Sequence, residues 1–142
     1  MKLRFIKVDK DVPNPAYIRD GDIAFDLRSN EEDYILKPME KKVFKSGLKL
    51  EIPVGFVGNI RDRSGLPAKQ SIHTMAGIID PNFRGEIGII LINLGHEEFK
   101  IEKNMRIAQM LIQKCEIVQF EEANELAETN RGENGFGSSG YK

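Results

Sequence analysis

Apolar and charged positions alternate along much of the chain, in the pattern that is typical of half-buried β-strands. Leu48, Leu50 and Ile52 alternate with charged residues, and we expect a strand there, with Gly47 and Pro53 marking its two ends. Similar short runs, separated by segments rich in Gly, Pro, Asn and Asp, occupy Lys2–Val8, Phe56–Arg61, Gly88–Leu94, Phe99–Ile101 and Ile107–Phe120. The pattern predicts many short strands and very little helix.

The segment after Ser64 is the one that favours a helix. The run Gly65–Lys69 follows a serine whose hydroxyl is suited to capping a first turn, and it contains an early proline, Pro67. We expect this helix to be short. Because sandwiches, barrels and jelly rolls all contain short strands at regular spacing, the pattern predicts an all-β fold but leaves the topology open.

Composition and charge narrow the class of protein. A chain of 142 residues suits a single domain, and contents of 40% hydrophobic and 30% charged residues are those of a folded globular chain. The formal net charge of −1 provides no general attraction to nucleic acid or to an anionic membrane. We therefore expect neither as a partner, and any bound anion must meet local cations.

The two ends of the chain and its single cysteine suggest a compartment and a domain boundary. Cys115 is the only cysteine, which excludes an intrachain disulfide and makes a reducing, cytoplasmic location the default expectation. Met1–Val8 alternates charged and apolar residues and does not resemble a signal peptide. From Glu121 onward the composition becomes acidic and then rich in glycine and serine. We expect one domain over residues 1–129 and a mobile tail over residues 130–142.

Two segments combine arginine with small residues that offer N–H and hydroxyl donors to a phosphate: Arg61–Gly65 and Arg131–Gly140. Taken alone, the first is more simply a polar turn with an arginine paired to Asp62, and the second a flexible glycine-serine terminus. Phe136 argues against the second alternative, because an aromatic ring between glycines has no core to join but is able to stack on a base.

Other polar residues have simple structural explanations when taken one at a time. Asp80 precedes Pro81 at the entry to a turn, which is usually turn chemistry, and Asp26 is more often a strand-end acid paired with arginine than a metal ligand. His73 and His96 have no metal-binding neighbours at ligand spacing, so we expect ordinary loop residues. The soft side chains expected to fill core or interface positions are Met105, Met110 and Cys115.

In order along the chain, five segments resemble the five motifs of the trimeric dUTPase family: Ala24–Leu27, Arg63–Leu66, Gly77–Gly85, Arg106–Gln109 and Arg131–Gly140. They span most of the chain. The resemblance implies a jelly-roll-like β-sandwich with one short helix and a flexible C-terminal tail, assembled as a homotrimer in which all three chains build each active site. It also implies hydrolysis of dUTP to dUMP and pyrophosphate, which limits uracil incorporation into DNA and supplies dUMP for thymidylate synthesis.

The same resemblance implies roles for individual residues. Asp80 would be the general base that activates water for attack on the α-phosphorus, and Phe83 would pack on the deoxyribose and exclude a 2′-hydroxyl. Contacts to the phosphates are implied for Arg63, Ser64, Gly65, Gln109, Arg131, Ser138 and Ser139. Contacts to uracil are implied for the hairpin around Gly77, Ile78 and Ile79, for Gly88 on the returning strand, and for Phe136 of the closing tail. Gly137 of the tail is also implied to bind the substrate.

Magnesium is the implied cofactor, because it neutralises the triphosphate and prefers phosphate oxygens and water to an all-protein cage. Asp26 would assist only through water, so no direct protein ligand is expected. The chain departs from the family pattern at four places. Ile23–Ala24–Phe25 is bulkier than the usual small-residue run, and Asn104–Met105 replaces a more usual Gly-Asp before Arg106. Many members have tyrosine where this chain has Phe83, and some have asparagine where it has Thr74.

Two other functions compete with this interpretation. dCTP deaminases have a related fold and resemble this chain around Asp80–Pro81, but they place a glutamate where this chain has Ile90, and they lack this kind of tail. Without that acid, deamination loses its proton carrier. A non-enzymatic nucleotide sensor is the other alternative, but a pure binder has no use for a positioned base such as Asp80.

Overall fold

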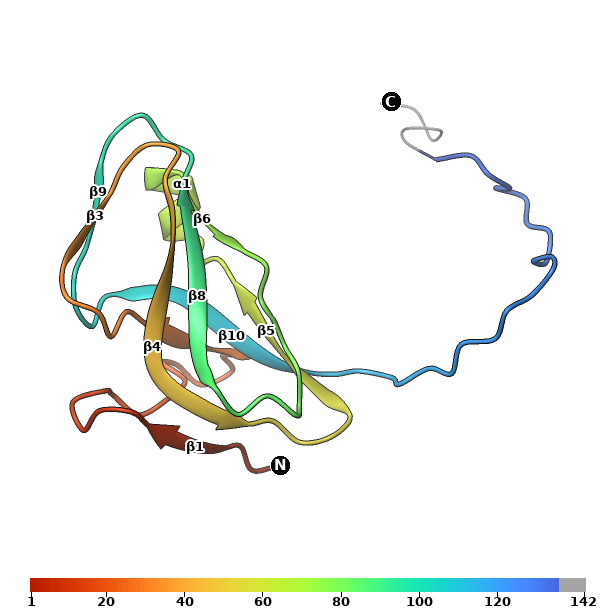
Figure 1. Ribbon diagram of the computed structural model, residues 1–142, viewed down its shortest axis with the longest axis horizontal. Coiled ribbons are helices and arrows are strands. Elements are labelled where there is room, and N and C mark those ends of the chain that lie inside the picture. The colour runs from red at the N-terminus through yellow and green to blue at the C-terminus, as the bar shows by residue number, and fades with distance from the viewer. Residues whose placement is uncertain (136–142) are drawn as a thin grey trace.

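A computed structural model describes residues 1–135, and these form short antiparallel strands and one helix (Figure 1). The elements, in chain order, are β1 (Arg4–Lys7), β2 (Ala24–Arg28), β3 (Tyr34–Leu36), β4 (Lys41–Glu51), β5 (Phe56–Arg61), α1 (Gly65–Gln70), β6 (Ile72–Met75), β7 (Ile78–Ile79), β8 (Glu86–Asn93), β9 (Phe99–Ile101) and β10 (Arg106–Lys114). The predicted all-β class and the predicted short helix are both confirmed.

Two four-stranded sheets face each other across the core. One has the strand order β1-β4-β8-β6 and the other β2-β10-β5-β7, while β3 and β9 form a separate two-stranded ladder. Consecutive strands repeatedly change sheet, since β4, β6 and β8 belong to the first and β5, β7 and β10 to the second. This is the jelly-roll-like sandwich that the family resemblance implies.

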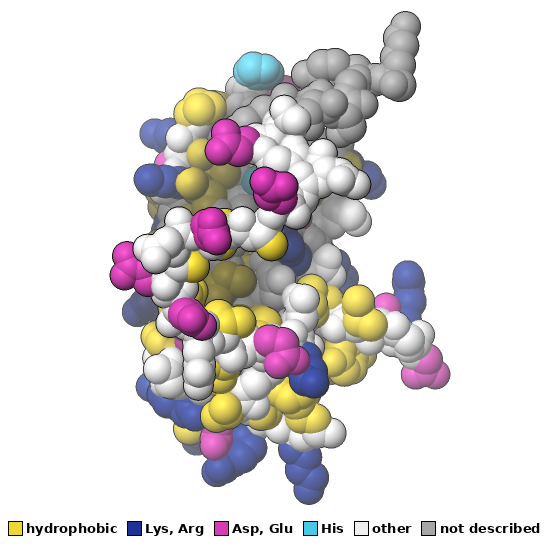
Figure 2. All heavy atoms as spheres, turned by 90° about the vertical axis from the view of Figure 1, so that its right-hand side faces the viewer, with side chains coloured by type: hydrophobic (Ala, Val, Ile, Leu, Met, Phe, Trp, Pro, Cys, Tyr) yellow, Lys and Arg dark blue, Asp and Glu magenta, His cyan; other side chains and the backbone are white. Residues whose placement is uncertain are grey.

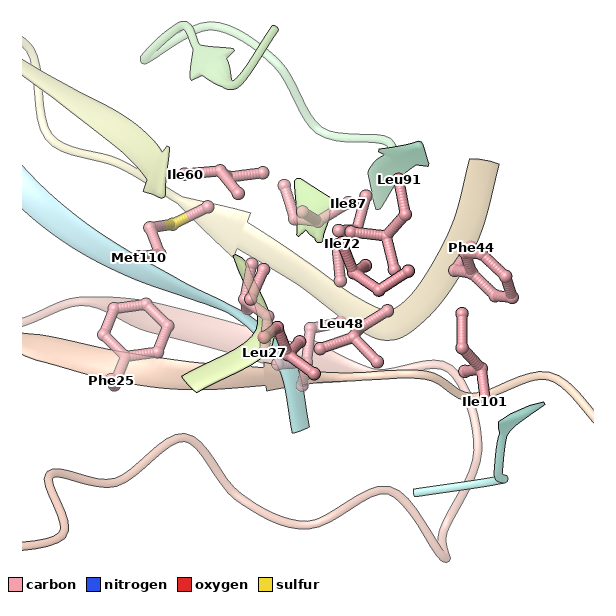
Figure 3. Packing of buried hydrophobic residues seen from close by; sticks show 14 of the residues in the cluster. Phe25, Leu27, Phe44, Leu48, Ile60, Ile72, Ile87, Leu91, Ile101 and Met110 are labelled. Atoms are coloured by element: carbon pink, nitrogen blue, oxygen red, sulfur yellow. The ribbon is translucent and has the colours of Figure 1, made fainter. Parts of the chain in front are cut away.

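Alternation along the strands creates the core between the sheets. In β8, Ile87, Ile89 and Leu91 are buried and their neighbours are half-exposed, as a strand with one inward face requires. Phe44 and Met110, from opposite sheets, are fully buried in the same cluster (Figure 3). Each such side chain contributes about 1.5–3 kcal/mol by leaving water. The position of Met110 confirms its predicted role as core filler.

Strand β4 is longer than predicted, and Gly47 bends it rather than ending it. The pairing register between β4 and β8 shifts between Lys45 and Lys49, which marks an irregularity in the ladder at Gly47. Gly47 has φ 72°, and a Cβ there would lie 2.3 Å from Cγ2 of Val12. A glycine inside an alternating run therefore gave a misleading signal of a strand end.

The predicted bounds hold for β5 and β9 but not for the last strand. β10 ends at Lys114 rather than Phe120, and Cys115 is exposed, so it is not core filler in the described chain. The apolar residues beyond it, Ile117, Val118 and Phe120, are 79%, 62% and 95% exposed. They continue the apolar pattern, but no strand within residues 1–135 pairs with them.

The start of α1 differs from the prediction. Ser64 has helical backbone angles of φ −48° and ψ −31°, and its side chain makes no capping hydrogen bond. An N-cap hydroxyl normally accepts from the N–H of the second or third helical residue, from an extended backbone. Here the third position is Pro67, which has no N–H. The hydroxyl of Ser64 is therefore left for another partner.

The segment that follows β10 leaves the body of the molecule (Figure 1). From Cys115 to Gly135 it contains no helix or strand, and every residue is exposed. Figure 2 views the molecule from this side and shows acidic side chains interspersed with apolar ones. Among residues 1–135, no helix is both long enough and apolar enough to cross a membrane.

Candidate active site

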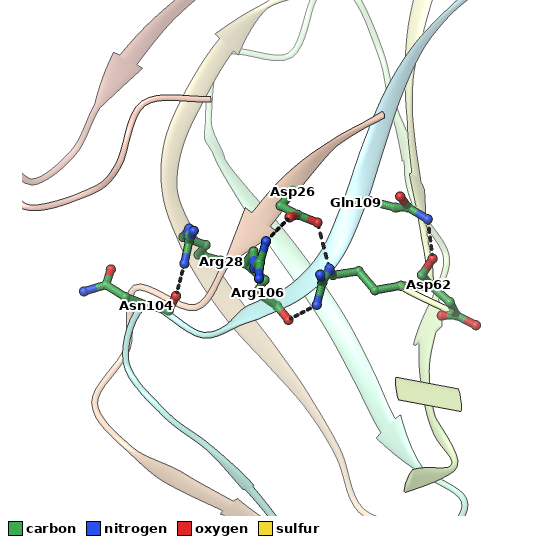
Figure 4. Close-up of polar contacts among 7 residues, drawn as sticks. Asp26, Arg28, Asp62, Asn104, Arg106 and Gln109 are labelled. Atoms are coloured by element: carbon green, nitrogen blue, oxygen red, sulfur yellow. Dashed lines mark hydrogen bonds and ion pairs between the residues drawn. The ribbon is translucent and has the colours of Figure 1, made fainter. Parts of the chain in front are cut away.

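Asp26 organises the polar face of the second sheet. It lies in the middle of β2, not at a strand end, and its side chain is only 14% exposed. Its Oδ1 accepts a hydrogen bond from Nε of Arg63 at 2.7 Å, and its Oδ2 accepts one from Nη1 of Arg106 at 3.2 Å (Figure 4). One carboxylate thus orients two guanidinium groups side by side. The prediction that Asp26 pairs with arginine is confirmed.

The turn between β5 and α1 brings Arg63 to this carboxylate. Nη1 of Arg63 also donates to the backbone oxygen of Arg106 at 3.3 Å, which ties the turn to β10. The simpler alternative, an arginine paired with Asp62, is wrong, because Arg63 pairs with Asp26 instead. Ser64 and Gly65 follow and are exposed, with no atom within 4 Å of a Cβ built on Gly65. Their donors face open space.

Gln109 lies in β10 between the other two strands, opposite Asp26 of β2 and Arg61 of β5. Its side-chain amide donates from Nε2 to the backbone oxygen of Asp62 at 2.7 Å (Figure 4). The amide oxygen and the second N–H of Gln109 remain available to a ligand.

The carboxylate of Asp62 is also engaged. Its Oδ1 accepts hydrogen bonds from the backbone N–H and the hydroxyl of Thr74, and its Oδ2 lies 3.0 Å from Nδ1 of His73. Partial burial by itself would raise the pKa of Asp62, but the hydrogen bonds from Thr74 and His73 outweigh it and lower the pKa below 3.8. His73 is therefore a paired residue of β6, and the expectation of an ordinary loop residue was wrong. His96 does lie in the connection between β8 and β9, as expected.

Eleven residues line one cleft of about 530 Å³. Five of them were predicted from the sequence: Asp26, Arg63, Ser64, Gly65 and Gln109. The others are Arg106, Ala24 and a group from the loop before β2, namely Ile18, Arg19, Asp22 and Ile23. Three arginines face two aspartates, so the cleft is locally cationic in a chain of nearly neutral charge. Such a site suits an anion with several oxygens.

The loop residues of this cleft were missed because nothing in their own sequence distinguishes them from a polar turn. Arg19 and Asp22 hold the loop closed, with the N–H of Arg19 donating to Oδ2 of Asp22 at 2.9 Å. The available signal was that the loop immediately precedes the first dUTPase-like motif.

The segment around Asp80 lies elsewhere. β7 is the edge strand of the second sheet, and three strand intervals of about 4.8 Å separate it from β2. Asp80 is exposed directly after β7 and does not line the cleft. β6 and β8 pair antiparallel, with Met75 opposite Ile90, so Gly77, Ile78 and Ile79 lie in the connection between the two arms of a hairpin, as predicted. This connection also crosses to the second sheet, where β7 pairs with β5.

Backbone geometry around this crossing is tight. Gly77 has φ 128°, its oxygen accepts from the N–H of Ile60 at 2.8 Å, and a Cβ on it would lie 2.7 Å from the oxygen of Ile60. Ile78 is 65% exposed, while Ile79 is half-buried. Phe83 is 43% exposed, and its ring covers Gly85 so closely that a Cβ on Gly85 would lie 2.5 Å from Cζ.

Two further predicted residues, Gly88 and Arg131, do not line the cleft either. Gly88 lies in β8, where a Cβ would lie 3.0 Å from Cγ1 of Val43. Arg131 is exposed on the segment that leaves the body, and its Nε donates to the oxygen of Asn134 at 2.8 Å. Predicted contacts that lie outside the described residues are Phe136, Gly137, Ser138 and Ser139.

Comparison with known proteins decides the family. A family model described as dUTPase matches residues 10–140 of this chain. A deoxyuridine 5'-triphosphate nucleotidohydrolase of Clostridium novyi (strain NT) is 49% identical over 142 residues and covers 99% of both chains, and the protein of that name from Clostridium kluyveri is 44% identical with the same coverage. This chain belongs to the dUTPase family.

Solved dUTPase structures have the same fold. The dUTPase of Staphylococcus bacteriophage 80alpha with dUPNHPP superimposes with a TM-score of 0.91, at 29% identity and 98% coverage of both chains. A G164S mutant of that phage dUTPase with dUpNHpp gives a TM-score of 0.92 at 28% identity. The cleft is lined by residues of the first, second and fourth dUTPase-like segments, Ala24–Leu27, Arg63–Leu66 and Arg106–Gln109. Asp80 belongs to the third, Gly77–Gly85.

Proposed function

We propose that this chain hydrolyses dUTP to dUMP and pyrophosphate. The observation that carries the proposal is the cleft itself, which brings the turn Arg63–Gly65 and Gln109 of β10 together beside Arg106. Asp26 pairs with both arginines. For the turn and for Gln109, the motifs imply contacts to phosphate. Its relatives carry the name of the dUTP-hydrolysing enzyme, and the phage neighbour was solved with a dUTP analogue.

The cleft would hold the phosphate chain and the leaving pyrophosphate. Each guanidinium has five N–H donors, and Arg63 and Arg106 use only one or two of theirs within the protein. The free hydroxyl of Ser64 and the free amide positions of Gln109 add neutral donors. Charge-assisted bonds of this kind stabilise the negative charge that develops on the departing pyrophosphate.

Asp80 would supply the base. A carboxylate within hydrogen-bond reach of a water accepts its proton as that water attacks the α-phosphorus and the bond to the bridging oxygen of pyrophosphate breaks. Asp80 is exposed, at the entry to a turn closed by a bond from the N–H of Phe83 to the oxygen of Asp80 at 3.2 Å. Its side chain is therefore free to meet a water beside a substrate.

Recognition of the nucleoside would fall to the same segment. Backbone groups on the open edge of β7, formed by Ile78 and Ile79, would read uracil together with Gly77 and with Gly88 of the returning strand. Cytosine would leave some of these polar groups without a partner, which is costly. The ring of Phe83 would cover the deoxyribose and leave no space for a 2′-hydroxyl. The partial exposure of Phe83 leaves one face of the ring free for that contact.

A homotrimer with shared sites explains why the cleft and Asp80 lie apart in one chain. The outer face of the first sheet carries Val43, Ile90 and Met75 side by side across β4, β8 and β6. Val43 is 53% and Met75 is 40% exposed, so this apolar stripe is uncovered in a single chain. A second copy packed against it would remove the stripe from water and bring its own Asp80 to the cleft.

The tail over residues 130–142 would close the site from a further chain. The segment before it is exposed, points away from its own body and carries apolar side chains with no partner within residues 1–135 (Figure 1). On closure, Arg131 would meet the γ-phosphate, Phe136 would stack on uracil, and Gly137, Ser138 and Ser139 would line the phosphates. Closure of this kind excludes water other than the nucleophile.

Magnesium fits this site only as an ion that is bound to the triphosphate and enters with it. Within residues 1–135 no three His, Cys, Asp or Glu side chains are grouped as a metal would require. Asp26 is already shared by two arginines, so it would assist a magnesium-bound water rather than bind the ion directly. When bound, the ion neutralises phosphate charge.

An exposed free thiol at Cys115 supports a reducing, cytoplasmic setting.

Turnover of dUTP in water enriched in ¹⁸O tests this proposal. Attack at the α-phosphorus places the label in dUMP, whereas label in pyrophosphate would show attack at the β-phosphorus. Asp80→Asn should lower turnover by about two to four orders of magnitude, the usual contribution of a general base, while nucleotide binding persists. Near-normal turnover in that variant would remove Asp80 from the role of base, and absence of any hydrolysis by the parent protein would refute the function.

A further inference from the structure

Asp62 connects three parts of the molecule, and the proposed reaction assigns it no role. It stands between the end of β5 and Arg63. Its carboxylate reaches Thr74 and His73 of β6, in the opposite sheet, with the hydroxyl of Thr74 donating at 2.7 Å. Its backbone oxygen accepts from Gln109 of β10 at 2.7 Å (Figure 4). The chain at this point is therefore held from two sides.

Apart from the bonds at Asp62, the turn that follows is tied to its surroundings mainly through the side chain of Arg63, which bonds Asp26 and the oxygen of Arg106. Helix α1 has only six residues, and Ser64 makes no capping hydrogen bond. Leu66 is its only buried residue, and Ser64 and Gly65 are exposed. Without the bonds at Asp62, only the long side chain of Arg63 would restrain the backbone between Arg61 and Leu66, and that backbone could shift. A displacement of about 1 Å is enough to disrupt a designed or evolved binding geometry.

We propose that Asp62 is a positioning residue that holds the phosphate-binding turn Arg63–Gly65 and the amide of Gln109 in place. The carboxylate of Asp62 anchors the turn to β6 and so fixes the position of the turn relative to the sheets. The carbonyl fixes the orientation of the Gln109 amide, which leaves its free positions facing the cleft. The inference rests on the proposed function, because it takes the cleft as the site of the phosphates.

A positioning role for Asp62 predicts a different effect on ligand binding from a role in fold stability alone. The turn and Gln109 would contact the β- and γ-phosphates far more than the nucleoside. Loss of the tether should therefore weaken a triphosphate selectively and leave a monophosphate nearly unaffected. A residue that only stabilises the fold would affect both ligands alike.

Three variants and one control separate these cases. Asp62→Ala removes every side-chain acceptor, Asp62→Asn keeps Oδ1 for Thr74, and Thr74→Ala removes one donor. Glu40→Ala is the control, because Glu40 binds Tyr34 and the N–H of Lys37 at the far β3–β4 connection. The measurements are the Kd values of full-length protein for dUpNHpp and dUMP, together with kcat and KM for dUTP.

Asp62→Ala should weaken dUpNHpp binding and raise KM by about tenfold, the effect of losing one or two hydrogen bonds, while the Kd for dUMP changes less than about twofold. Asp62→Asn should restore triphosphate binding to within about threefold of the parent. Thr74→Ala should weaken it by about threefold, and Glu40→Ala should leave both Kd values unchanged. If Asp62→Ala fails to fold, the selective loss in Thr74→Ala carries the test.

Equal losses for dUpNHpp and dUMP, or unchanged binding of both, would overturn the inference. Amide hydrogen exchange without nucleotide separates it from the proposed function. Residues 62–66 should exchange faster in Asp62→Ala than in the parent and in Glu40→Ala. Faster exchange together with a parent protein that does not turn over dUTP would refute the function and retain the tether, whereas unchanged exchange in an active protein would refute the tether alone.

Discussion

Asp26 shows how one side chain can prepare a cationic site before any ligand arrives. Two arginines that approach from different elements would repel each other in isolation. The carboxylate of Asp26 lies between them and takes one bond from each, at 2.7 and 3.2 Å. It fixes both guanidinium planes and neutralises only one of the two charges. The remaining charge is available to a phosphate.

Phe83 and Gly85 form the contact that should set sugar specificity. Gly85→Ala would place a Cβ 2.5 Å from Cζ and 2.8 Å from Cε2 of the ring, so the ring must swing away while the backbone can remain. We expect both Phe83→Ala and Gly85→Ala to lower the preference for dUTP over UTP by about tenfold or more, measured as the ratio of the two kcat/KM values. An unchanged ratio in both variants would show that this ring does not read the sugar.

Asp62 should also make stability depend on pH. Its pKa is lowered in the folded chain, so its charged form stabilises the fold above the unfolded pKa of about 3.8, and this contribution is lost as the pH falls through the lower folded value. Asp62→Asn lacks that titration. At one fixed protein concentration, the difference in unfolding free energy between parent and Asp62→Asn should shrink from pH 7 toward pH 3. A difference that stays constant would contradict the lowered pKa.

Among the elements, the strands with strong alternation could be predicted and those defined by pairing could not. β5 and β9 have the predicted bounds because their apolar positions and flanking turn residues agree. β7 has two residues and exists only because it pairs with β5, and β6 has a single buried residue, Ile72. The prediction extended β10 to Phe120 because apolar residues continue there, although no strand in the described part of the chain pairs with them.

The bend in β4 yields a prediction at the element scale. Gly47→Ala would combine a left-handed backbone with a Cβ 2.3 Å from Cγ2 of Val12, and we expect a loss of about 2–4 kcal/mol in unfolding free energy. Gly55→Ala is the matched control, because Gly55 has φ 83° but no atom within 4 Å of the added Cβ. It should cost only about 1 kcal/mol. Equal losses in urea unfolding would mean that crowding at Val12 is relieved by movement of the loop.

For the molecule as a whole, the separation of chemistry within one chain is the main feature. The family resemblance implied that Asp26, Arg63 and Gln109 serve one active site, and strand pairing together with a short turn brings them to one cleft. Arg19 could not be predicted, because it reaches the cleft only through the path of its loop. Asp80 and Phe83 lie beyond the opposite edge of the sheet. A pattern along one chain gives no information on which copy supplies a residue.

Mixed trimers test whether the site is shared. Asp80→Asn and a chain truncated before Asn130 should each be nearly inactive alone. Refolded together, they should form some sites that combine the intact Asp80 of the truncated chain with the intact tail of the other. Activity should then exceed the sum of the two parents, measured on trimers shown to contain both chains. No recovery in such trimers would place the base and the tail within one chain.

The most direct test of the account is pyrophosphate release by the purified protein with magnesium, measured in parallel on dUTP, UTP, dCTP and dTTP. The account predicts rapid release from dUTP and kcat/KM values lower by at least about a hundredfold for each of the others. The ring of Phe83 would exclude the 2′-hydroxyl of UTP, and the backbone groups around Ile78 and Ile79 would disfavour a base other than uracil. Comparable rates for dUTP and dCTP, or no release from dUTP, would contradict it.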